Sequence, residues 1–122
     1  MKRVISSDSI TILDDNNKTM LRITEKLTDN VMYFKVSGEP SSSVSYDFED
    51  ELTAAASVCN KIRLDLNEVT CISSVAIRAL LSVQQLLDKD DEAELRITGM
   101  NNAVLEMFKE NGFDLLFNID ER

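Results

Sequence analysis

The hydrophobic and polar residues of this chain follow two different periods, and the change falls near Gly38. Before it, Ser9–Leu13, Met20–Leu27 and Val31–Val36 alternate between polar and apolar positions or are rich in β-branched and aromatic residues. That pattern is typical of β-strands. The polar runs DDNNK and TDN between these segments predict tight turns. We therefore expect Met20–Leu27 and Val31–Val36 to form an antiparallel hairpin.

After Gly38 the apolar positions recur at helical spacing. Val44, Phe48, Leu52, Ala55 and Cys59 predict an amphipathic helix, for which the serines in 41–45 are N-cap candidates. The remaining segments predict strands and helices in alternation. The strand-like segments are Lys61–Leu66, Leu95–Thr98 and Leu115–Ile119. Between the first two lies the predicted helix Val75–Leu87, with Ile77, Leu80, Leu81 and Leu87 facing inward, and between the last two lies a helix with Val104, Leu105 and Phe108 facing inward, which ends at Asn111-Gly112.

This order of elements predicts an α/β fold. Strands joined by helices run parallel with right-handed crossovers, so we expect an α/β sandwich. Its mixed β-sheet has four to five strands, with three to four helices and the N-terminal hairpin. We expect residues 1–19 to form an N-terminal extension with one extra strand, and residues 20–122 to form the domain. Cys59 and Cys71 are interpreted as free thiols that act as small core residues.

Composition and charge exclude several classes of function. The 122 residues include 22 acidic and 13 basic side chains, for a net charge of −9, and no His. Without His there is no Ser-His-Asp triad, and two Cys cannot supply a four-thiolate zinc site. The three Gly stand far apart, so no phosphate-binding loop is expected. The acidity disfavours nucleic acid or an anionic membrane as partner.

We expect no catalytic residues, no metal, no cofactor, no nucleic acid partner and no insertion into a membrane. The start of the chain lacks the apolar core of an export signal, and no stretch approaches the length of a membrane span. Cytoplasmic localisation is therefore expected.

Two adjacent serines stand where a strand-end loop enters an apolar helix. Ser73 or Ser74 would serve as the N-cap and accept a hydrogen bond from the first turn. A helix N-terminus also tolerates a phosphoryl group, which adds about −1.5 to −2 charges. No acidic residue lies between Val69 and Leu87, where Arg78 is the only charge. The acidic run Asp88–Glu94, in contrast, lies in a predicted turn, where solvated charge is the default.

The stretch Lys61–Leu81, KIRLDLNEVTCISSVAIRALL, resembles the central signature of the STAS domain, the fold of bacterial anti-sigma factor antagonists. In that family a strand ending in Leu-Asp-Leu is followed by Val-x-x-Ile, then Asp-Ser-Ser/Thr-Gly and an apolar helix. The strand that ends in Ser-Gly-Glu at Glu39 resembles another family feature. The resemblance covers roughly residues 20–120.

The resemblance implies a docking site and a phosphoacceptor. Ser74 stands where the family has the phosphorylated Ser, with Ser73 as the alternative acceptor at the Asp position. Val75 replaces the second hydroxyl residue and Ala76 the Gly. The implied partner is an anti-sigma factor of the serine-kinase type, bound by a monomer or weak dimer. The implied partner-binding residues are Gly38, Glu39, Ser41, Ser73, Ser74, Val75, Ala76 and Arg78.

Two alternatives remain open. The first is a STAS scaffold that binds its partner constitutively and has lost the phosphorylation switch, as the altered residues around Ser74 suggest. The second is a small-molecule-binding enzyme on a flavodoxin-like α/β fold, against which the missing glycine loop counts.

Overall fold

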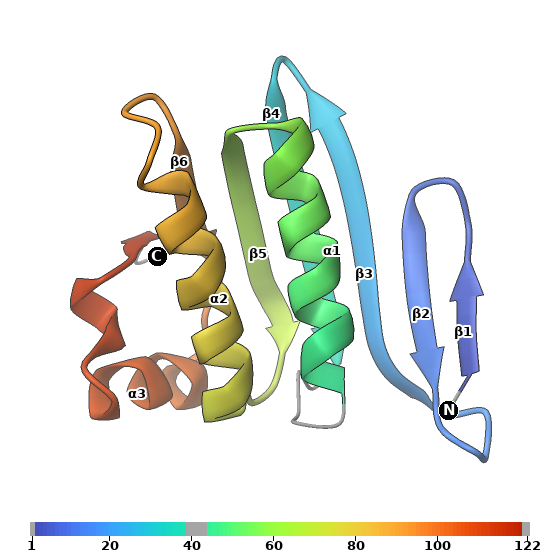
Figure 1. The fold of residues 1–122 in the computed structure, drawn as a ribbon. Helices are drawn as coiled ribbons and strands as arrows, with labels where there is room; N and C mark the ends of the chain where they lie inside the picture. Colours follow the sequence, from blue (N-terminus) through green and yellow to red (C-terminus); the bar gives the residue numbers. More distant parts are fainter. Residues whose placement is uncertain (1, 39–43, 121–122) are drawn as a thin grey trace.

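The computed structural model describes residues 2–38 and 44–120, except for the side chains of Ser45 and Asp120. Its elements alternate after an N-terminal run of strands (Figure 1). In chain order they are β1 (Lys2–Ile5), β2 (Ser9–Leu13), β3 (Thr19–Thr28), β4 (Val31–Gly38), α1 (Ser45–Val58), β5 (Lys61–Val69), α2 (Ser74–Leu87), β6 (Glu94–Thr98), α3 (Asn102–Glu110), a 3-10 turn (Phe113–Leu115) and β7 (Asn118–Asp120).

The strands form one mixed sheet, in which they lie in the order of the sequence from β1 to β7. The pairs from β1 to β4 are antiparallel and those from β4 to β7 are parallel. The predicted hairpin of β3 and β4 is confirmed, and it turns through Asp29 and Asn30, both with positive φ. Such a pair matches the primed turn that a twisted hairpin requires.

The predicted α/β fold is confirmed, but the predicted strand count of four to five is wrong because the described residues form a sheet of seven strands. Residues 1–19 contribute two of these strands rather than one. Strand β1 was missed because all four of its residues are exposed, so no buried face imposes an apolar alternation on its sequence. Strand β7 has only three residues, too few to show a period.

The three helices of the described ranges, α1, α2 and α3, lie on one face of the sheet (Figure 1). A crossover between parallel strands is right-handed, and each of these crossovers adds the next strand on the same side of the last. Every connecting helix is therefore carried to the same face. Within the described residues, the opposite face of the sheet is covered by no helix.

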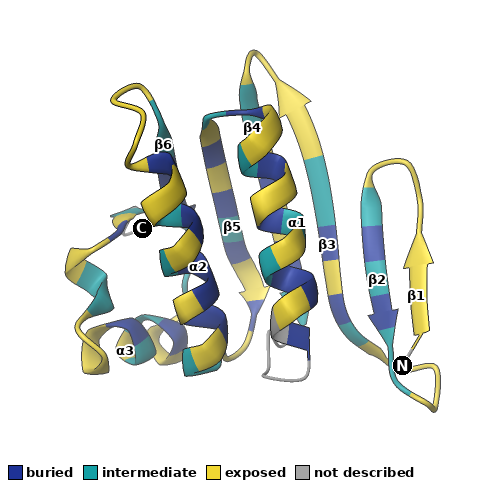
Figure 2. Cartoon of the chain, viewed as in Figure 1, coloured by how far each residue is buried: buried dark blue, intermediate teal, exposed yellow. Residues whose placement is uncertain are grey.

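The core lies between the sheet and these helices, where buried and exposed residues alternate along the strands (Figure 2). The predicted apolar face of α1 is confirmed, since all five residues that were expected to form it are buried: Val44, Phe48, Leu52, Ala55 and Cys59. In α2 three of the four predicted inward residues are buried and Leu81 is partly buried. In α3 Val104 and Phe108 are buried, whereas Leu105 is only half-buried.

Two local predictions differ from the structure. Cys71 is exposed rather than part of the core, because the neighbouring Ile72 takes the buried position in the loop after β5. Helix α1 has Val44 as its N-cap and no side-chain cap, so the expected serine cap is not found at that position. The serines 41–43 lie outside the described residues.

An ion pair ties the outermost strand to the helix layer. The Arg3 guanidinium of β1 donates to the Asp47 carboxylate in the first turn of α1. Asp47 is buried, and a buried carboxylate without a cationic partner would be strongly destabilising. This contact gives the exposed strand β1 a defined position relative to α1.

A second carboxylate, that of Glu25, lies on the helix-facing side of the sheet and forms no ion pair with a basic residue in the described part of the chain. Glu25 follows the buried Ile23 by two residues on β3, and it approaches Glu51 of α1. Burial, and then the negative charge of Glu51 and a hydrogen bond with it, raise the pKa of Glu25 to about 6 from 4.5.

We predict that this pair makes the domain less stable as the pH rises. The folded state holds the Glu25 proton more tightly than the unfolded chain does. The stability that this proton binding contributes is therefore complete below about pH 4.5 and is lost as the pH rises through about 6. Glu25→Gln should raise the free energy of unfolding at pH 7.5 by about 1 kcal/mol, after allowance for solvent screening. Urea denaturation at pH 4.5 and 7.5 measures this, with the exposed Glu106→Gln as control. An equal gain at both pH values would contradict the prediction.

Candidate functional site

The N-termini of the three helices gather at one edge of the sheet, beyond the ends of β4, β5 and β6 (Figure 1). Because these strands run parallel, their carboxyl ends share that edge, and Gly38 at the end of β4 lies opposite Val69 at the end of β5. Ligands of open α/β sheets typically bind outside the carboxyl ends of the strands. The Ser73-Ser74 pair lies at this edge, where the loop after β5 enters α2.

The two serines have different roles at the start of α2. Ser73 is the N-cap, and its Oγ accepts a hydrogen bond from the Ala76 N–H at 3.1 Å. Ser74 is the first residue of the helix and is half-buried. Its hydroxyl makes no hydrogen bond to the part of the chain that the structure describes. The prediction that one of the pair caps the helix is therefore confirmed, and the cap is Ser73.

A β-bulge directs the chain from β5 into this site. Lys35 pairs with Asp65 and Ser37 with Glu68, so β5 uses three residues where β4 uses two. The extra residue returns Val69 to the core, whereas Glu68 faces solvent and pairs with Lys35 at 3.3 Å. A bulge bends its strand and re-aims the residues that follow it.

Two glycines allow the backbones around this edge to approach closely. Gly38 has φ +99, and a Cβ there would lie 2.5 Å from the Met20 carbonyl oxygen of β3. Gly99, after β6, has φ +77, and a Cβ there would lie 2.9 Å from the Asp65 Oδ1. Both positions thus require Gly for conformation as well as for space. They hold the ends of β3, β4, β5 and β6 together behind the loop that carries Ser73.

Asn101 connects this loop to α3, and sequence reasoning missed it. Its Oδ1 caps α3 by accepting from the Val104 N–H at 2.8 Å. Its Nδ2 donates to the carbonyl oxygens of Val69 and Thr70, at 3.2 and 3.3 Å. An Asn before a helical period signals a cap. Its second role, the hydrogen bonds to carbonyl groups 31 and 32 residues earlier in the sequence, has no local sequence signal.

The residues predicted to bind a partner are only partly brought together. Val75 is 42% exposed beside Ser74, and Arg78 is exposed one helical turn later. Ala76 is completely buried, so a partner cannot touch its side chain and we remove it from the contact residues. Gly38, at the end of β4, has no side chain and can offer a partner only its backbone. Glu39 and Ser41 lie outside the described residues.

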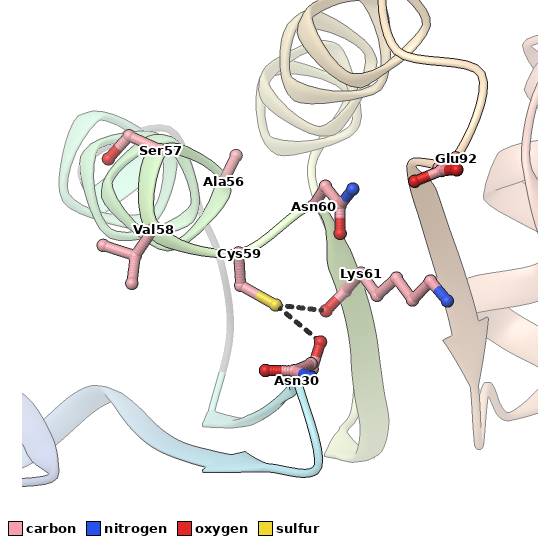
Figure 3. Close-up of a pocket in the computed structure, with 8 residues that line it drawn as sticks. All are labelled: Asn30, Ala56, Ser57, Val58, Cys59, Asn60, Lys61 and Glu92. Carbon is pink, nitrogen blue, oxygen red and sulfur yellow. Dashed lines mark hydrogen bonds between the residues drawn. The ribbon is translucent and has the colours of Figure 1, made fainter.

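A hollow of about 510 Å³ lies at the opposite edge, around the end of α1 and the start of β5 (Figure 3). The Cys59 thiol lines it and donates to the carbonyl oxygens of Asn30 and Lys61, at 3.0 and 3.3 Å. This hollow therefore does not belong to the Ser74 edge. No group of three or more His, Cys, Asp or Glu side chains in the described ranges is placed to hold a metal ion.

The acidic turn 88–94 also lies at this opposite edge. Asp90 organises it, because its carboxylate accepts hydrogen bonds from the Asn60 Nδ2 at 3.1 Å and from the Glu92 N–H at 3.0 Å. The hydrogen bond from Asn60, and then that from Glu92, lower the pKa of Asp90 below its usual value.

Comparison with known proteins decides the family. The family model described as "Mlab, STAS domain" matches residues 23–118. This chain belongs to the STAS domain family. A comparison with curated protein sequences found no match. None of the helices in the described part of this STAS domain is long and apolar enough to cross a membrane.

Solved structures share the fold at low sequence identity. An anti-sigma factor antagonist from Mycobacterium paratuberculosis matches with a TM-score of 0.77 and 18% identity, over 91% of this chain and 92% of that one. A putative anti-sigma factor antagonist from Thermotoga maritima matches with 0.70 and 16%, over 82% and 86%. The antagonist SpoIIAA in its unphosphorylated form matches with 0.64 and 9%, over 82% and 88%. The STAS domain described here thus has the fold of anti-sigma factor antagonists.

Variants of Asn101 test how this edge is held. Asn101→Ala removes both the cap and the donor, and it should destabilise the domain by about 1 kcal/mol. Asn101→Asp keeps an oxygen to cap α3 but loses the donor, so stability should largely return. Hydrogen exchange of the amides in residues 70–74 should be faster in both variants and unchanged in the neighbouring Asn102→Ala. Normal exchange in Asn101→Asp would show that the bridge to Val69 and Thr70 does not hold the loop.

Proposed function

We propose that this domain is a regulatory binding module of the anti-sigma factor antagonist type. It docks an anti-sigma factor of the serine-kinase type through the first turns of α2, and phosphorylation of Ser74 weakens that docking. The observation that carries the proposal is the division of roles between the two serines. Ser73 supplies the helix cap, so the Ser74 hydroxyl stands at the helix N-terminus with no hydrogen bond to the described part of the chain.

The domain itself should tolerate a phosphoryl group on Ser74. The group would lie at the positive end of the α2 dipole, where an anion contributes about 0.3–1 kcal/mol of stability. Arg78 follows at i+4 on the same face of α2, within reach of the added charge. The first turn of α2 contains no acidic residue that would repel it. The effect of phosphorylation therefore falls on the partner rather than on the fold.

The exposed surface of α2 explains how one phosphoryl group can act as a switch. Val75, Arg78, Ser82 and Leu86 recur at helical spacing and are exposed. This stripe holds no acidic residue, although the chain as a whole carries −9. A partner that buries it meets an almost neutral surface. A phosphoserine at its end would have to be desolvated, which disfavours binding.

Kinase treatment tests whether Ser74 is the acceptor. The domain is incubated with ATP and an anti-sigma factor of the serine-kinase type, and phosphopeptides are mapped by mass spectrometry. We expect one phosphoryl group on Ser74, none on Ser74→Ala and an unchanged yield on Ser82→Ala, which changes an exposed serine of the same helix. Phosphate on Ser73 instead, or no phosphate, would rule out Ser74 as the switch.

A charge at position 74 tests the docking surface directly. Ser74→Glu should weaken binding to the same kinase by at least about tenfold, which corresponds to about 1.4 kcal/mol. Ser74→Ala should bind like the wild type, and thermal melting should show that both variants are folded. Full binding by Ser74→Glu would favour a STAS scaffold that binds constitutively. The presence of Val75 where the family has a hydroxyl residue also favours that alternative.

A further inference from the structure

The sheet face that carries no helix has a charge opposite to that of the rest of the molecule. Strand alternation and register assign seven basic and three acidic residues to this face, among those whose side chains are described. More than half of the 13 basic residues of the chain thus lie on this face. The basic residues are Lys2, Arg22, Lys26, Lys35, Lys61, Arg63 and Arg96, and the acidic ones are Asp65, Glu68 and Glu94.

One row across this face concentrates the positive charge. Lys26 lies opposite Tyr33, Tyr33 opposite Arg63, and Arg63 opposite Arg96, on the four neighbouring strands from β3 to β6. We name these four residues the cationic row. Tyr33 is 45% exposed at its centre, with a basic residue on each side.

The cationic row leaves one guanidinium without an anion. Like charges directly opposite each other on neighbouring strands are destabilising. Arg96 pairs with Glu94 at 3.3 Å, whereas Arg63 makes no ion pair or hydrogen bond within the described ranges. Strand pairing alone does not require two arginines here. A carboxylate placed between them could take a bidentate hydrogen bond from Arg63, which is among the stronger interactions of its kind.

We propose that the cationic row binds an acidic segment of a partner protein. Four strands spaced about 4.8 Å apart place its ends about 14 Å apart, a distance that an extended segment of about five residues spans. The carboxylates of such a segment would lie over Lys26, Arg63 and Arg96. The Tyr33 ring offers an apolar surface and a hydroxyl at the centre of the row.

The charge distribution favours an acidic protein segment over nucleic acid. With a surplus of positive charge on this one face, the remaining surface of the chain is more acidic than its net charge of −9 indicates. A nucleic acid strand extends its phosphates beyond the row and meets that acidic surface, which repels it. A short acidic segment ends within the row.

This surface is separate from the docking surface proposed on α2. The helices lie on one side of the sheet (Figure 1). Strand alternation and register assign the cationic row to the other side. Occupation of one surface therefore does not block the other, and the two proposals are tested by different variants.

The test is an NMR titration of the labelled full chain with a blocked acidic peptide of about six residues, alternating Asp and Glu, and with its Asn/Gln counterpart. We expect the acidic peptide to shift the amides around Tyr33 and Arg63, and the neutral peptide to shift none. Arg63→Gln should weaken binding by at least about fivefold. Arg78→Gln, which removes an arginine from the helix side, should bind like the wild type. Raising the salt from about 50 to about 300 mM should also weaken binding.

Five outcomes would overturn the proposal. Equal binding by Arg63→Gln, or equal loss in Arg78→Gln, would show that the peptide responds only to overall charge. Tighter binding of a single-stranded oligonucleotide would assign the row to nucleic acid. A dimer of the wild type that Arg63→Gln dissociates in sedimentation would show that a second copy covers this face. Absence of binding to the folded wild type would remove the acidic segment as its occupant.

Discussion

The handedness of the strand crossovers determines most of what this molecule presents to a partner. Each right-handed crossover after β4 adds its strand on the same side, so α1, α2 and α3 lie on one face of the sheet. Two consequences follow from this single constraint. The helix N-termini share one edge, where Ser74 stands at the start of α2. The other face is left to its strand side chains, which carry the cationic row.

Those parts of the fold that a local period specifies could be predicted from the sequence. The apolar face of α1, the β3–β4 hairpin and the parallel core strands all follow from spacing and turn residues, and the structure confirms them. The serine pair at the start of α2 was also found, since a capping residue before an apolar helix is a local signal. Strand β1 was missed because its exposed residues are held by pairing and by Arg3 rather than by burial.

The contacts that shape the site depend on residues far apart in the sequence. The bulge in β5 is visible only in its register with β4, and the bridge from Asn101 to the loop after β5 only in three dimensions. The cationic row likewise requires the register of four strands, because Lys26 and Arg96 are separated by most of the domain. A single sequence contains these residues but not their alignment.

The proposed function depends on the docking of a kinase-type partner on the N-terminal part of α2, at the edge where the helices begin. The direct test is an NMR titration, in which the amide signals of the labelled domain are recorded while an unlabelled anti-sigma factor of the serine-kinase type is added. We expect the signals from Ser73 to Ser82 and around Gly38 to change, and those of Tyr33 and Arg63 on the bare sheet face to stay unchanged. Changes confined to the bare face, with α2 unaffected, would contradict it.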